Sequence, residues 1–96
     1  MRWPKVGEFG WPSGRKLAKL LFTAKQAPWV RSETWHKDQV GESTDDGGFL
    51  LTVPYSDPRE LVLEILRYGP DVRVLEPVEL QQVVAERLRA AADQYV

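Results

Sequence analysis

Cysteine is absent from this 96-residue sequence, and histidine occurs once, as His36. Without thiols the chain has no disulfide framework, no thiolate metal site and no cysteine nucleophile, which is typical of proteins in a reducing cytoplasm. A zinc site needs three or four converging ligands, and a single imidazole does not provide them. We therefore expect no metal ion and no cofactor.

Net charge and long apolar runs are also lacking. Thirteen Lys and Arg against fourteen Asp and Glu leave a formal charge of −1, which gives no general attraction to nucleic acid or to an anionic membrane. No apolar run approaches the ~18 residues of a transmembrane helix, and the N-terminal MRWPKVGEFG lacks the apolar stretch of a signal peptide. These absences predict a soluble, cytoplasmic protein with no membrane partner.

The small net charge conceals an uneven distribution along the chain. Residues 1–40 hold eight Lys and Arg against three acids, a charge of +5, whereas residues 41–96 hold five Arg against eleven acids, a charge of −6. Such asymmetry is compatible with a basic face for phosphates, with head-to-tail association of two molecules, or with solvated surface on both halves. The sequence leaves these three interpretations open.

Motifs that would carry catalysis are missing. The Gly pair at 47–48 lies inside a predicted hairpin rather than between a strand and a helix, so it offers no phosphate-binding loop. The Asp pair at 45–46 lacks the spaced carboxylates of a calcium loop and is better explained as part of a turn. His36 has no orienting carboxylate if Asp38 points away along an extended segment. We therefore expect a protein that is not an enzyme.

A chain of this length suits one domain with a core of modest size. Residues 1–14 mix aromatic residues with Pro and Gly and lack periodicity, so we interpret them as an irregular arm before a domain over 15–96. Thr23 would cap the first helix of that domain, and Pro28 would kink or restart it. Periodicity and turn signals predict strands near 16–22, 39–44, 48–54 and 71–75, and helices near 24–32, 58–68 and 78–94.

The clearest helix signal lies in the middle of the chain. Asp57 is a good N-cap, Pro58 suits the first helical position, and Glu60 follows three residues after the cap. Ile65 and Leu66 then lie on a broad apolar face of this helix. The Gly-Pro pair at 69–70 ends it, because Gly adopts the left-handed conformation and Pro cannot continue a helix.

The predicted element order is β-α-β-β-α-β-α. Its first six elements match the ferredoxin-like split βαβ, so we predict an α+β fold with a four-stranded antiparallel sheet, two helices on one face and an appended C-terminal helix. RNA-recognition modules of this type stack bases on aromatic residues of the central strands. Here the segment DVRVL has no aromatic residue and FLLTV has only Phe49. The sequence therefore does not indicate such a module.

Several short pieces of the sequence follow one another in a characteristic order. They are Leu20-Leu21-Phe22, Ala27 to Arg31, Trp35-His36 followed by Gln39, Asp46-Gly47-Gly48 before Leu50 to Val53, Arg67 to Val72, and Val74 to Pro77 followed by Leu80 and Tyr95. In this order and spacing, from Lys16 to Tyr95, they resemble the C-terminal extension, called WCX, of bacterial WYL-domain transcriptional regulators.

The resemblance implies a non-catalytic regulatory and dimerisation module. Regulators of this family join a DNA-binding winged helix-turn-helix to a WYL module associated with ligand sensing and to the extension. The implied partners are the WYL and helix-turn-helix modules of a parent regulator, with DNA contacted only indirectly, and a second copy in a weak homodimer. Because these 96 residues contain neither module, we expect a fragment, a truncated gene product or a stand-alone extension.

The same resemblance carries over a candidate interaction cluster, made of Trp29, Arg31, Trp35, His36 and Gln39. We interpret these residues as surface or interface residues, since no acid–base or metal partner accompanies them in the sequence. An alternative function is small-ligand or nucleic-acid binding by this cluster together with the basic N-terminal half. For self-association, we expect the final helix or the arm over 1–14 at the interface.

Overall fold

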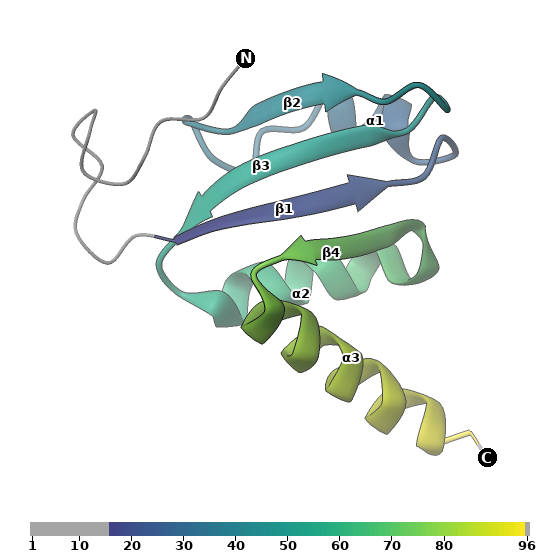
Figure 1. The fold of residues 1–96 in the computed structure, drawn as a ribbon. Helices are drawn as coiled ribbons and strands as arrows, with labels where there is room; N and C mark the ends of the chain where they lie inside the picture. The colour runs from purple at the N-terminus through teal and green to yellow at the C-terminus, as the bar shows by residue number, and fades with distance from the viewer. Residues whose placement is uncertain (1–15, 96) are drawn as a thin grey trace.

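A four-stranded antiparallel sheet forms the framework of the computed structural model, which describes residues 16–95 (Figure 1). Its strands are β1 (Lys16–Phe22), β2 (Val40–Ser43), β3 (Phe49–Tyr55) and β4 (Val72–Glu76). The helices are α1 (Ala27–Arg31), α2 (Pro58–Tyr68) and α3 (Val78–Asp93), with a 3-10 turn, η1 (Gly69–Asp71), after α2. The predicted arm over residues 1–14 lies outside the described part of the chain.

The sheet confirms the predicted α+β class. The strands follow the order β2-β3-β1-β4, and all neighbouring pairs are antiparallel. β3 lies between β1 and β2, and β1 lies between β3 and β4, so the two βαβ units interleave as they do in a split βαβ arrangement. Each strand lies within one residue of its predicted bounds.

The first helix is shorter than the predicted range of 24–32. The side chain of Thr23 does not cap it: the Thr23 carbonyl accepts hydrogen bonds from the amides of Gln26 and Ala27, and its hydroxyl donates to Asp71. Pro28 lies in the first turn of α1, where the missing N–H costs no helical hydrogen bond. Pro28 therefore restarts the helix and does not kink it.

The second helix begins and ends where the sequence predicts. The Asp57 carboxylate accepts a hydrogen bond from the amide of Arg59 at 3.0 Å, and Pro58 occupies the first turn. At the other end Gly69 adopts a φ of 53°, a conformation that side chains disfavour. The cap and the glycine together set the length of α2.

The predicted hairpin between β2 and β3 is also present. Gly47 has a φ of 87°, and the amide of Gly48 donates to the Asp46 carboxylate at 3.2 Å. The same carboxylate accepts a hydrogen bond from the Thr44 hydroxyl, and these two contacts lower the pKa of Asp46. The Asp46 carboxylate therefore supports the backbone geometry of this turn.

One hydrophobic core joins the sheet to all three helices. Alternate residues of β1 and β3 point to the same face, because their register pairs Leu20 with Leu51 and Phe22 with Phe49. Figure 1 shows α1 and α2 together behind the sheet. The buried apolar residues are Ala18, Leu20, Phe22, Ala27, Val30, Phe49, Leu51, Val53, Leu61, Val62, Ile65, Val74, Leu80 and Val84. No helix within residues 16–95 is long and apolar enough to cross a membrane.

The core makes the inward face of α2 sensitive to truncation. Ile65 is 1% exposed, whereas Leu63 on the same helix is 61% exposed. We expect Ile65→Ala to lower the free energy of unfolding by about 2–5 kcal/mol, because the change leaves a cavity among packed side chains. Leu63→Ala is the matched control and should cost less than about 1 kcal/mol. Urea unfolding followed by circular dichroism measures both, and equal effects would contradict this orientation of α2.

Candidate functional site

The segment from Glu33 to Gln39 holds the predicted Trp35-His36 pair and is shaped by one side chain. The Gln39 amide oxygen accepts hydrogen bonds from the backbone amides of Trp35, at 2.6 Å, and His36, at 3.0 Å. Its amide nitrogen donates to the Glu33 carbonyl at 3.0 Å. The Gln39 side chain thus provides the hydrogen bonds that a neighbouring strand would otherwise give to this backbone. Its amide group is used within the loop.

Trp35 belongs to a group of three aromatic rings. Its ring centroid lies 5.8 Å from that of Phe22, edge-on, and 6.0 Å from that of Tyr68, stacked. The Phe22 and Tyr68 rings meet edge-on at 5.2 Å. Such geometries are the favourable ones for aromatic pairs, so the group attaches the loop to the end of β1 and to α2.

The Glu33 carboxylate completes this group. One of its oxygens accepts from the Trp35 indole N–H at 3.1 Å and from the Tyr68 hydroxyl at 2.5 Å. The hydrogen bond from Tyr68, followed by that from Trp35, lowers the pKa of Glu33 in spite of its partial burial. Burial and the bond to Glu33 raise the pKa of Tyr68 to about 12, so the phenol remains a donor at any neutral pH.

The other two members of the predicted cluster lie on α1. Trp29 is 68% exposed. The Arg31 guanidinium lies over the Phe49 ring, 5.6 Å from its centroid, and donates to the Ser43 hydroxyl at 3.3 Å. The members of the cluster differ in their contacts: Trp35 and Gln39 support the loop, Arg31 lies over the Phe49 ring while remaining exposed, and Trp29 is exposed.

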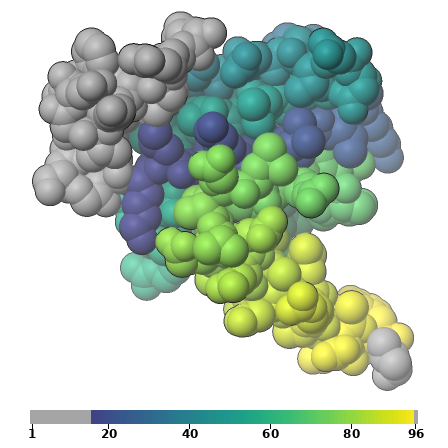
Figure 2. Space-filling view, in the orientation of Figure 1, coloured from purple at the N-terminus to yellow at the C-terminus, as the bar shows by residue number. Residues whose placement is uncertain are grey.

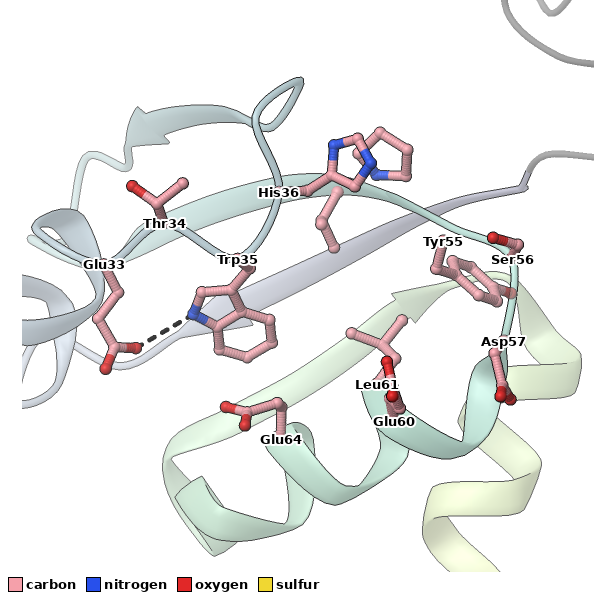
Figure 3. Close-up of a pocket in the computed structure, with 12 residues that line it drawn as sticks. Glu33, Thr34, Trp35, His36, Tyr55, Ser56, Asp57, Glu60, Leu61 and Glu64 are labelled. Carbon is pink, nitrogen blue, oxygen red and sulfur yellow. Dashed lines mark hydrogen bonds between the residues drawn. The ribbon is translucent and has the colours of Figure 1, made fainter.

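A pocket of about 520 Å³ opens between the loop, the end of β3 and the first half of α2 (Figure 3). Trp35 and His36 line it, while Trp29, Arg31 and Gln39 do not. The remaining lining comes from residues 33, 34, 53–57, 60, 61 and 64. Sequence reasoning missed the contribution of α2, although Asp57, Glu60 and Glu64 recur at helical spacing and so share one face.

The pocket is acidic. Its carboxylates are Glu33, Asp57, Glu60 and Glu64, and no Lys or Arg is among the described residues that line it. Within residues 16–95 there is no group of three or more His, Cys, Asp or Glu side chains that could hold a metal ion. The arrangement therefore offers negative charge beside aromatic and apolar surface.

His36 is placed differently from the sequence expectation. Residues 36–39 form a turn and not an extended segment, so the Asp38 carboxylate lies 3.9 Å from His36 Nδ1. The same nitrogen accepts a hydrogen bond from the Asp38 amide at 3.0 Å. As an acceptor at Nδ1, the imidazole orients the turn, and Asp38 lies closer to His36 than it would in the extended segment that the sequence predicts.

The hydrogen bond from Tyr68 to Glu33 should affect how the free energy of unfolding depends on pH. We expect Tyr68→Phe to lower the free energy of unfolding at pH 7 by about 1 kcal/mol, because a charge-assisted hydrogen bond is lost in a partly exposed site. A lowered carboxylate pKa contributes stability above its unfolded value, and this is lost as the pH falls through the folded value. The variant should therefore lose less stability than the wild type between about pH 5 and pH 3.

Tyr55→Phe is the matched control, because the Tyr55 hydroxyl makes no contact with Glu33 in the described structure. Chemical unfolding at several pH values measures all three proteins. An unchanged pH dependence in Tyr68→Phe would contradict the assignment of this bond as the cause of the lowered Glu33 pKa.

Comparisons with known proteins agree with the resemblance found in the sequence. A family model of the WCX domain matches residues 15–92. Among solved structures, the chain is similar to proteasome accessory factor B/C (PafBC) of Arthrobacter aurescens, with a TM-score of 0.70 and 27% sequence identity. That match covers 88% of this chain but 13% of the PafBC chain. A search of curated proteins finds no match. Since the family model extends from the start of β1 into the last turns of α3, the chain belongs to the WCX domain family.

Proposed function

We propose that the chain is a non-catalytic regulatory and dimerisation module of a WYL-type bacterial transcriptional regulator. Membership of the WCX family and the likeness to PafBC support the regulatory part of this proposal. The observation that carries the dimerisation part is the second half of α3, whose apolar side chains Leu88 and Tyr95 are exposed in the described structure. In this role the module contacts DNA only through the helix-turn-helix and WYL modules of a parent regulator, in the cytoplasm where the DNA lies.

The apolar stripe of α3 continues beyond the core. Leu80 and Val84 are buried against α2 and β4, and the next residues of the same stripe are Leu88, Ala91 and Tyr95. Leu88 is 41% exposed and Tyr95 is 92% exposed. Figure 2 shows this segment projecting from the body of the protein in yellow. The projecting part leaves apolar side chains in water that a further contact would cover.

A second copy of the chain fits this stripe. If two α3 segments pair antiparallel, Leu88 lies opposite Tyr95 of the second copy, and the small Ala91 side chain near the axis lets the helices approach closely. The segment over residues 86–95 carries two acids and two Arg, so two copies do not repel each other by net charge. A two-fold pairing of this kind uses the same patch on both molecules.

The nucleic-acid alternative receives less support from the site geometry. Trp35 and His36 line an acidic pocket, which repels phosphates, and Arg31 is packed on the Phe49 ring. Trp29 offers an exposed aromatic side chain of the kind that is enriched where proteins contact one another. We therefore place partner contacts at Trp29 and α3 in this proposal.

Sedimentation over a hundredfold range of protein concentration tests the dimer. We expect a dissociation constant in the micromolar range, about −8 kcal/mol, and a weak dependence on salt, because the stripe is apolar. Leu88→Glu should remain monomeric throughout this range, since it places a charge in the stripe.

Leu63→Glu is the matched control, because Leu63 is also exposed but lies on α2, away from the stripe. It should dimerise as the wild type does. A wild type that is monomeric at every concentration would remove dimerisation from the proposal, and loss of the dimer in Leu63→Glu would assign it to another face.

A further inference from the structure

We propose that the pocket between the Glu33–His36 loop and the first half of α2 binds a guanidinium group, such as the end of an arginine side chain. The shape of the pocket, the distribution of charge around it and the chemistry of its walls favour this ligand. The site does not depend on dimerisation, because α3 does not line the pocket.

The pocket has a floor of packed side chains and two unlike walls. Val53 and Leu61 belong to the hydrophobic core and form apolar surface at the base. Figure 3 shows the Trp35 ring extending from the loop toward α2, while Glu60 and Glu64 lie on the helix opposite. A volume of about 520 Å³ is within the usual range for small-ligand sites.

The charge of the lining favours a cation. Four carboxylates are among the described lining residues, and the Arg residues that pair with two of them lie outside the lining. Arg59 pairs with Asp57 and Arg67 pairs with Glu64, each at 3.2 Å and each on the exposed side of α2. The Arg67 charge also acts on Glu33, whose pKa it helps to lower, so the two ion pairs offset part of the negative charge. Glu33 and Glu60 form no ion pair among the described residues and keep the lining acidic.

Glu60 is the carboxylate best placed to meet a ligand. Glu33 is engaged by Trp35 and Tyr68, and Asp57 caps α2. In the described part of the chain, Glu60 makes no ion pair or side-chain hydrogen bond, and it lies one turn before Glu64 on the same face. Glu60 can therefore accept from a planar donor, and Glu64, which already accepts from Arg67, adds negative charge beside it.

Aromatic and apolar walls select a guanidinium among cations. A guanidinium stacks on aromatic rings and donates several hydrogen bonds in a plane, whereas an ammonium is compact and strongly hydrated. The rings of Trp35 and Tyr55 and the side chain of Pro54 offer the surface for a flat cation and its aliphatic stem. The Trp35 indole N–H is already bound to Glu33, so the ring contributes its apolar surface to the pocket.

Two-dimensional ¹H–¹⁵N NMR of the full chain tests this site. We use agmatine as a free guanidino compound, the peptide acetyl-Gly-Arg-Gly-amide as an arginine side chain of a partner, and tetramethylammonium as a cation without N–H donors, all at matched ionic strength. Saturable shifts are expected at the Trp35 indole and at the amides of His36 and Leu61 with the two guanidinium probes. Tetramethylammonium should bind more weakly.

The double variant Glu60→Gln/Glu64→Gln should weaken guanidinium binding at least about tenfold, because it removes two charged acceptors and keeps the side-chain size. The control Glu42→Gln/Glu86→Gln makes the same change in net charge at exposed residues outside the pocket and should bind as the wild type does. Leu88→Glu should also bind normally, which separates this site from the proposed dimer.

The outcomes decide both the site and the source of the ligand. Tighter binding of the peptide assigns the pocket to an arginine of a partner protein, and tighter binding of agmatine assigns it to a free guanidino compound. Absence of saturable shifts with both probes would overturn the proposal. Equal weakening in the pocket variant and in the control variant would overturn it too, since binding would then follow net charge alone.

Discussion

The pairing of β1 with β3 is the contact on which the rest of the structure depends. Their seven-residue antiparallel register places Ala18, Leu20 and Phe22 on one face beside Val53, Leu51 and Phe49. β2 and β4 then add to the outer edges of this pair, and the helices pack on the apolar face that it creates. Strand pairing of this kind both satisfies the backbone and aligns the side chains, so the core follows from one register.

The same pairing positions the pocket. Phe22 ends β1 and contacts the rings of both Trp35 and Tyr68, and Glu33 joins these two rings through hydrogen bonds. The loop is thereby held above α2, whose N-terminal cap follows β3 directly. The pocket is thus the space between the loop and α2, and the aromatic group fixes the position of the loop relative to this helix.

The last helix divides its apolar stripe between two uses. Its first turns complete the core through Leu80 and Val84, which stabilises the domain. The later turns repeat the same spacing with Leu88 and Tyr95 where no described residue covers them. One helix therefore supports the fold and presents an apolar surface, and the acidic pocket lies on a different part of the molecule from this surface.

The sequence alone was sufficient for the strands, for the hairpin at Asp46 to Gly48 and for the cap and end of α2, because periodicity, turn residues and caps act over a few neighbouring positions. It also contained the order of residues that identifies the WCX family. It was insufficient for the roles of the cluster: Gln39 closes a loop and Trp35 stacks on Tyr68 through contacts with residues distant along the chain. The pocket and its acidic wall arise only when α2 lies opposite the loop, and only tertiary packing decides which charges then face one another.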